Sequence, residues 1–237
     1  MKKAILLGST SIALAFAMLA TGFLAGKPTA AADSSPQTAQ AVMDKEEQRL
    51  VGLKTIESNR DDIFRSPHDG IVGNPDGKIS IVEFYDYNCG FCKRAQDDML
   101  ALTEENPNLR FVLKEFPILG PDSQKAHIVS QAFQSLMPEK YAEFHNQLLP
   151  SRSHVGEAAA MKVALSLGAD EAALREAMKD PKIVDTFNQT YELANKLAIT
   201  GTPSYVVGNE VVFGALGKDV LAEKIAAAQA ACTAEAC

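Results

Sequence analysis

Two cysteines separated by two residues constrain most strongly what this chain can fold into. Cys89 and Cys92 follow a run of strand-forming residues over 79–87 and open a helical pattern over 92–102. A strand that delivers two thiols to the first turn of a helix creates the geometry of thiol–disulfide exchange. The helix dipole and the unpaired amides there stabilise a thiolate, which is the nucleophile in the exchange. We therefore expect a redox-active pair at the end of a buried strand.

Two other uses of a Cys-x-x-Cys pair compete with this interpretation. A structural zinc site needs two further ligands at a matching spacing. The other cysteines, Cys232 and Cys237, lie in an alanine-rich tail with a poorly matching spacing, and the four histidines are scattered. We therefore expect no bound metal. An inert structural disulfide is the remaining alternative.

The N-terminus has the pattern of a secretory signal peptide. Two lysines follow Met1, residues 4–26 are apolar or small, and Ala30-Ala31-Ala32 offers a small-residue cleavage site. We predict a signal peptide over 1–32 and export to the periplasm, where disulfides persist. The apolar stretch is also long enough for an uncleaved membrane anchor, which is the alternative. Cleavage removes three lysines and takes the net charge from −7 to −10, so no nucleic-acid partner is expected.

Residues 33–66 are expected to form a linker and an N-terminal helical arm. Residues 33–40 are rich in Ser, Pro, Gln and Ala, whereas 41–64 carry a charged helical pattern. The apolar positions of this pattern share roughly one face: Met43, Leu50, Leu53 and Ile56. So short a stripe fits a helix packed on its own domain, and it also fits an arm that forms a homo-oligomer.

The remainder of the chain predicts an α/β fold over 67–231. A second strand over 109–116 follows the helix, so that strand, helix and strand form a βαβ unit with a parallel pair. Residues 121–199 are helical in pattern and carry no strand signal, which indicates an inserted all-helical subdomain. A hairpin around Gly208-Asn209 and a last helix over 217–231 complete a small mixed sheet.

Two segments together resemble the DsbA-like thiol–disulfide oxidoreductases of the thioredoxin superfamily. The first runs from Val82 to Lys93 and includes Cys89-Gly90-Phe91-Cys92, and the second is Gly201-Thr202-Pro203-Ser204-Tyr205. The resemblance covers roughly residues 73–231 and is strongest for the Com1-like and ScsC-like members, which carry an N-terminal helical arm. It implies a thioredoxin fold with a helical insertion.

The resemblance assigns different roles to the two thiols. Cys89 is expected to attack, and Cys92, one turn further along the helix, is expected to resolve the mixed disulfide. Phe91 would flank the site and contact substrate. It carries no charge, whereas family members with histidine at this position can hydrogen-bond the thiolate. We therefore expect Cys89 to be less acidic than the thiol of the strongest oxidants in the family.

Glu83 is a charged residue in the middle of an apolar strand. One interpretation is a solvated residue on an edge strand. The other, which the resemblance supports, is a buried carboxylate with a raised pKa that accepts the proton of Cys92. Lys114, in the neighbouring strand, could pair with Glu83 and partly reverse that shift.

Pro203 precedes the hairpin and could simply end a helix and open a strand. The resemblance implies instead a cis peptide bond after Thr202, against the Cys-x-x-Cys pair, where both residues would bind an extended substrate peptide. Cys232 and Cys237, in the tail over 232–237, are close enough in sequence to form a structural disulfide; a redox relay or a link between chains are the alternatives.

These observations predict an exported thiol:disulfide oxidoreductase or isomerase without a small-molecule cofactor. Its substrates would be unfolded or misfolded exported proteins, and a membrane protein of the DsbB type, or of the DsbD or ScsB type, would restore its redox state. Gly90, after the first cysteine, and Thr202, before Pro203, resemble the residues that isomerases carry at these positions more than those of dedicated oxidases. The alternative function is a copper(I)-binding or chaperone protein with the same fold, since two nearby thiolates are soft ligands.

Overall fold

The computed structural model describes residues 36–231, with side chains from residue 43 onward. The chain divides at Ala41, and apart from the first residues of helix α1 the features discussed below lie in the compact unit that begins at Val42. The expected signal peptide and the Cys232–Cys237 pair fall outside the described residues. Within the described part, no helix has the length and apolar character needed to cross a bilayer.

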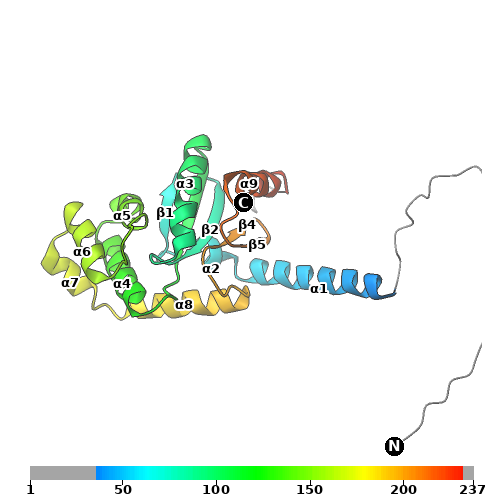
Figure 1. The fold of residues 1–237 in the computed structure, drawn as a ribbon, viewed down its shortest axis with the longest axis horizontal. Helices are drawn as coiled ribbons and strands as arrows, with labels where there is room; N and C mark the ends of the chain where they lie inside the picture. The colour runs from blue at the N-terminus through cyan, green and yellow to red at the C-terminus, as the bar shows by residue number, and fades with distance from the viewer. Residues whose placement is uncertain (1–35, 232–237) are drawn as a thin grey trace, which may run out of the picture. The chain divides into compact units, whose positions relative to one another are not determined.

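Five strands form one sheet in the order β1-β3-β2-β4-β5 (Figure 1). Their bounds are β1 Gly70–Gly73, β2 Ile79–Tyr85, β3 Leu109–Glu115, β4 Ser204–Val207 and β5 Glu210–Phe213. The central strand β2 runs parallel to β3 and antiparallel to β4. Helix α3, Gly90–Glu105, connects β2 to β3, and the expected βαβ unit is therefore present. The hairpin β4–β5 and the final helix α9, Lys218–Ala231, also lie where the sequence places them.

Strand β1 was not expected, because no run of strand-forming residues marks 70–73. It pairs antiparallel with β3, and Gly70 stands opposite Leu113. A Cβ on Gly70 would lie 1.7 Å from the ring of Tyr141, so glycine is required by close packing rather than by a turn. Two glycines in four residues hide a strand from propensity-based analysis.

The helical insertion occupies the chain between β3 and β4, as the sequence predicts. Its elements are α4 Pro121–Leu136, the 3₁₀ turn Pro138–Lys140, α5 Tyr141–Leu148, α6 Glu157–Ser166, α7 Glu171–Ala177 and α8 Lys182–Lys196. The breaks fall at the expected prolines and glycine. Asp170 caps α7, since its side chain accepts a hydrogen bond of 2.8 Å from the amide of Ala173.

Each face of the sheet carries its own hydrophobic cluster. Alternation along β2 sends Ile81 and Tyr85 to the larger cluster, with α3, α9 and the helices α4 to α7, and sends Val82 and Phe84 to the smaller one. The smaller cluster includes residues of α8 and of the N-terminal helices α1, Pro36–Ser58, and α2, Arg60–Phe64. The thioredoxin-type sheet is therefore covered on both faces, as a parallel pair requires.

The N-terminal helix differs from its predicted bounds. Helix α1 begins at Pro36, so that residues 36–40, expected to be linker, are helical. Proline is favoured in the first turn of a helix, which explains the earlier start. Ile56 is buried in the smaller cluster, whereas Met43 and Leu50 are exposed. The end of the helix therefore packs on its own domain, and oligomerisation through the exposed positions stays a prediction.

Replacing Ala198 with glycine is expected to stabilise the protein by about 1 kcal/mol. Ala198 has a positive φ of 56° where α8 ends, and Ile199 donates to the carbonyl of Ala194 across it. Glycine adopts this conformation without the steric cost of a Cβ. Urea denaturation followed by circular dichroism measures the change. Gly168 ends α6 in the same way, with φ of 94°, so Gly168→Ala should shift the midpoint in the opposite direction.

Candidate active site

The two thiols stand where β2 passes into α3. Cys89 is the residue that precedes α3, and its sulfur accepts a hydrogen bond of 3.4 Å from the amide of Cys92. The Cys89 thiol donates to the carbonyl oxygen of Thr202 at 3.1 Å. Both cysteines are free thiols in this structure. The structure therefore brings three of the predicted site residues into direct contact.

The environments of the two thiols shift their pKa values in opposite directions. Hydrogen bonds from the Cys92 side chain and from the first amides of helix α3 lower the pKa of Cys89 to about 5. Burial, followed by the hydrogen bond to Cys89 and the charge of Glu83, raises the pKa of Cys92 well above its usual range. At neutral pH one thiol is therefore ionised and the other holds its proton.

Asp86 and Asn88 fix the loop that carries Cys89, and the sequence analysis did not identify either. The Asp86 carboxylate accepts hydrogen bonds from the amide of Asn88 at 2.7 Å and from the hydroxyl of Ser123 at 2.8 Å. The Asn88 side chain donates to the carbonyl of Val155 at 2.8 Å and accepts from its amide at 2.7 Å. Ser123 and Val155 belong to the insertion, so the insertion holds the active-site loop in place.

A buried polar network lies behind the same loop. The amide of Tyr87 donates to Nε2 of His127 at 3.3 Å, so the proton of the neutral ring is on Nδ1, which donates to Glu115 at 2.7 Å. Ser130 and Tyr141 also donate to Glu115, at 2.6 and 3.1 Å. These donors satisfy a carboxylate that has almost no exposure to water. No short motif marks this network, because its members come from four segments: the loop after β2, strand β3, and helices α4 and α5.

Glu83 lies in the central strand with 1% of its surface exposed, so the solvated edge-strand interpretation is wrong. Neither of its carboxylate oxygens has a hydrogen-bond partner among the described residues. Burial, and secondly the charge of Cys89, raise the pKa of Glu83 to about 8. Its environment therefore favours the protonated carboxyl at pH 7.

The suggested pairing of Glu83 with Lys114 is also wrong. Parallel register places Glu83 opposite Leu113 and Phe84 opposite Lys114, so the two charged side chains point to opposite faces of the sheet. The Lys114 ammonium instead pairs with Asp69 at 2.5 Å. Lys114 is therefore not among the groups that shift the pKa of Glu83.

An apolar groove lies beside the thiols. It has a volume of about 560 Å³ and is lined by Phe91, residues 200–204, Phe213, Gly214, Ala215 and Leu216. The Thr202–Pro203 peptide bond is cis. Phe91 is 58% exposed, and the guanidinium of Arg94 lies 4.3 Å from the centre of its ring. The groove thus presents an exposed aromatic ring two residues after Cys89.

No cluster of three or more His, Cys, Asp or Glu side chains within residues 43–231 is arranged to hold a metal ion. Cys89 and Cys92 are the only cysteines in that range. The arrangement of the described residues is therefore one for sulfur chemistry between a thiolate, a buried thiol and a buried carboxyl group.

A protein-family model described as the DSBA-like thioredoxin domain matches residues 80–226. A thioredoxin-like oxidoreductase from Silicibacter pomeroyi DSS-3 is 34% identical, with a TM-score of 0.69, over 73% of this chain and 99% of its own. The thiol-disulfide exchange protein α-DsbA2 from Wolbachia pipientis is 28% identical, with a TM-score of 0.70, over 76% and 97%. The catalytic domain of Proteus mirabilis ScsC is 25% identical, with a TM-score of 0.68, over 75% and 98%.

One match to a curated protein is of a different kind. The Na(+)/H(+) antiporter NhaA 3 from Salinispora tropica is 22% identical over 162 residues, which cover 68% of this chain. The chain spans only 24% of the length of that relative. The match therefore carries no transport activity over to this chain.

Proposed function

Because the chain belongs to the family of DSBA-like thioredoxin domains, we propose that it is an exported thiol:disulfide oxidoreductase acting on other proteins through Cys89 and Cys92. The pair itself carries the two electrons, so no small-molecule cofactor is required. Its substrates are unfolded or misfolded exported proteins. The signal-peptide pattern of residues 1–32 supports a periplasmic location.

The contrast between the two thiols carries this proposal. The Cys89 thiolate, with its pKa near 5, attacks a substrate disulfide, forms a mixed disulfide and releases one substrate thiolate. Cys92 then loses its proton and attacks the sulfur of Cys89, which releases the second substrate thiolate. The substrate gains two electrons, and the protein is left with a Cys89–Cys92 disulfide. The reverse sequence oxidises a substrate dithiol.

Glu83 supplies the acceptor for the proton of Cys92 in this proposal. The charge of Glu83 raises the pKa of Cys92, which supports the two groups being within electrostatic reach. A carboxyl group with a pKa near 8 can take up and release a proton near neutral pH, as a proton carrier has to do.

The direction of electron flow proposed here is that of an isomerase or reductase. The pKa of Cys89, near 5, lies between the value of ~7 in thioredoxin and of ~3.5 in DsbA, the strong oxidant. Phe91 cannot donate a hydrogen bond from its side chain to the thiolate. A membrane partner of the DsbD or ScsB type would keep such a pair reduced, whereas a DsbB-type partner would be needed for an oxidase.

The reduction potential of the Cys89–Cys92 pair is expected to lie at roughly −180 to −230 mV. The signal-free protein is equilibrated in glutathione buffers, and labelled thiols are read by mass so that Cys232 and Cys237 are scored separately. A potential near about −120 mV would replace the isomerase proposal with an oxidase. A potential below about −300 mV would indicate an inert structural disulfide and would remove the proposed function altogether.

A trapping experiment in the export compartment complements that measurement. Cys92→Ala leaves Cys89 able to attack but unable to be released, so substrate proteins should accumulate as mixed disulfides. The matched control is Cys89→Ala, which should trap none. If Cys92→Ala also traps none while the reduced parent protein holds copper(I) against glutathione, metal binding is the function instead.

A further inference from the structure

Strand β5 leaves one edge of the sheet open. It is the last strand in the sheet and pairs on one side, with β4. The amide of Gly214 donates to the carbonyl of Pro203 at 2.9 Å. Because hydrogen-bonded and non-bonded pairs alternate in an antiparallel ladder, Glu210 and Val212 also bond toward β4. The amides and carbonyls of Val211 and Phe213 therefore point away from the sheet.

The side chains of this edge turn an apolar surface toward α1. Val212 is buried in the larger cluster, so Val211 and Phe213, at alternate positions, face the opposite side of the sheet. Val211 is half-buried against the smaller cluster, which contains Ile56 and Leu197. Phe213 is 53% exposed although it is one of the largest apolar side chains on the surface.

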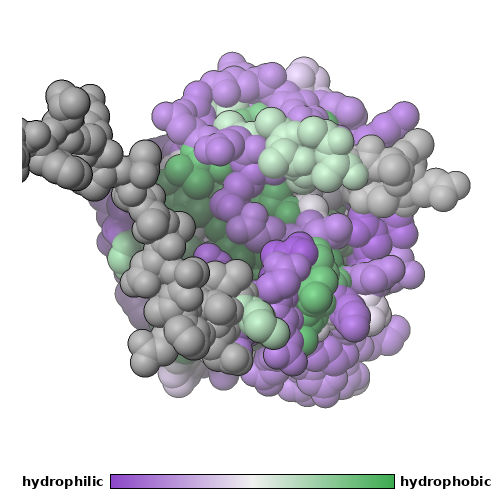
Figure 2. Space-filling view, turned by 90° about the vertical axis from the view of Figure 1, so that its right-hand side faces the viewer, coloured by the Kyte–Doolittle hydropathy of each residue, from purple (hydrophilic) through white to green (hydrophobic). Residues whose placement is uncertain are grey.

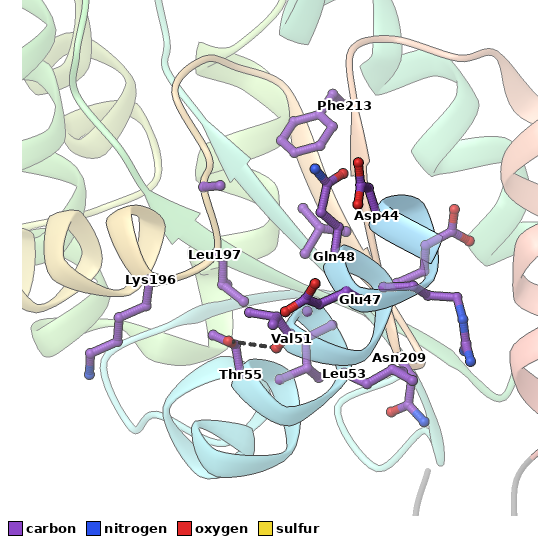
Figure 3. Close-up of a pocket in the computed structure, with 16 residues that line it drawn as sticks. Asp44, Glu47, Gln48, Val51, Leu53, Thr55, Lys196, Leu197, Asn209 and Phe213 are labelled. Carbon is purple, nitrogen blue, oxygen red and sulfur yellow. Dashed lines mark hydrogen bonds between the residues drawn. The ribbon is translucent and has the colours of Figure 1, made fainter. Parts of the chain in front are cut away.

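A groove of about 850 Å³ lies between α1 and this edge (Figure 3). Its apolar lining comes mainly from Val51, Leu53, Ile56, Leu197, Val211 and Phe213. On the face that contains this region, hydrophobic surface lies in a hollow between hydrophilic residues (Figure 2). Its polar residues include Asn209 at the hairpin turn and Thr55, whose hydroxyl already donates to the carbonyl of Val51 at 2.9 Å.

This groove continues into the groove beside Cys89. Phe213 lines both of them. The hydrogen bond between Gly214 and Pro203 holds the end of β5 beside Thr202. The carbonyl of Thr202 accepts a hydrogen bond from the thiol of Cys89. A four-residue strand is about 13 Å long. A chain that lies along β5 therefore meets the active-site groove within a few residues.

We propose that the outer edge of β5 binds the extended main chain of the substrate, a few residues away from the cysteine that reacts with Cys89, as an added strand. The inference rests on the proposed function and names the form of substrate that the site prefers. Outward amides and carbonyls are matched by another extended backbone, and the apolar wall of α1 receives alternate side chains. A folded protein cannot present such a segment, so the surface selects unfolded chains.

Three synthetic peptides test the proposal, each with one cysteine held in a disulfide with glutathione. One has five residues, and the other two add about eight residues of alternating Val and Thr before or after that core. The second-order rate constant for their reaction with the reduced protein is measured by stopped flow. One of the two long peptides is expected to react about tenfold faster than the core peptide.

Two substitutions locate the source of that advantage. Val211→Pro removes an outward amide, which an edge strand tolerates, whereas Val211→Thr keeps the amide and the side-chain shape. Val51→Glu places a charge on the exposed α1 wall without touching the sheet. We expect Val211→Pro and Val51→Glu to abolish the advantage of the long peptide, and Val211→Thr to retain most of it. Reaction with glutathione disulfide should stay within twofold of the parent in all three.

The outcomes distinguish failure of this inference from failure of the proposed function on which it rests. Equal rates for the three peptides, or equal losses in Val211→Pro and Val211→Thr, would overturn strand addition while leaving disulfide exchange intact. A concentration-dependent oligomer that Val211→Pro dissolves would assign the edge to a second copy of the chain and would also overturn it. Failure of the parent to react with glutathione disulfide would instead remove the proposed function.

Discussion

At pH 6, Cys89 of the reduced protein is expected to be alkylated at least about a thousandfold faster than Cys92. The pKa of Cys89 is lowered to about 5, so nearly all of it is thiolate at that pH. Burial keeps Cys92 protonated and out of reach of the reagent. Iodoacetamide labelling with mass detection at each cysteine measures both rate constants. The rate at Cys89 should be nearly level above pH 6 and fall tenfold per unit below about pH 5.

The control for this prediction is Cys89→Ser, which should lose the fast phase entirely and leave Cys92 slow. A midpoint for Cys89 in the ordinary thiol range, about 8.5, would contradict the arrangement of donors around its sulfur. It would also weaken the case for Cys89 as the attacking group, because that case depends on an accessible thiolate at neutral pH.

Glu83→Gln is expected to stabilise the reduced protein by about 3 kcal/mol at pH 7 and to give no comparable gain at pH 4. Burial raises the pKa of Glu83 from 4.5 to about 8. Between these values the unfolded chain has released a proton that the native state still holds, so stability falls as pH rises. The loss is about 1.4 kcal/mol per pH unit and levels off above pH 8. The amide cannot ionise and avoids this loss.

Urea denaturation followed by far-ultraviolet circular dichroism, at intervals from pH 4 to pH 9, measures the effect. The pH 4 data serve as the internal control, because Glu83 is neutral there in both states and only the exchange of acid for amide remains. Parallel stability profiles for parent and variant would show that Glu83 is not held protonated by the fold. A carboxylate with an ordinary pKa would be too weak a base to carry the proton of Cys92 near neutral pH, so the proposed transfer would lose its support.

The sequence was sufficient for four strands of the sheet and for the insertion, because each of these elements has a strong local signal. Continuous apolar runs predicted β2 and β3, prolines and glycines divided the insertion, and Gly208-Asn209 predicted the hairpin. Strand β1 has no such signal, since Gly70 is selected by the ring of Tyr141, which follows about 70 positions later, and Gly73 has a positive φ and lies against the carbonyl of Leu109. The predicted Cys-x-x-Cys pair and Thr202–Pro203 lie in contact for the same reason: each is a local motif on a recognisable fold.

The support of the site could not be predicted in this way. Two groups of hydrogen bonds join residues that are far apart in sequence: the pair Asn88–Val155 and the network Tyr87–His127–Glu115. A single residue of any of these types is common in proteins and does not identify its partner. The error over Lys114 has a different cause. Proximity of two strands was inferred correctly, but the side on which each charge falls depends on register, and a shift of one residue reverses it.

The position of the insertion also determines the order in which the strands can pair during synthesis. Ile79 of β2 pairs with Leu109, whereas Ile81 pairs with Val207 across the whole insertion. Closing the longer loop costs about 1 kcal/mol more in chain entropy, and it has to wait until the last quarter of the chain has emerged. A chain delivered from its N-terminus therefore exposes its Cys-x-x-Cys pair before the carbonyl of Thr202 can reach it. The nascent protein gains its complete active site only when translation is nearly finished.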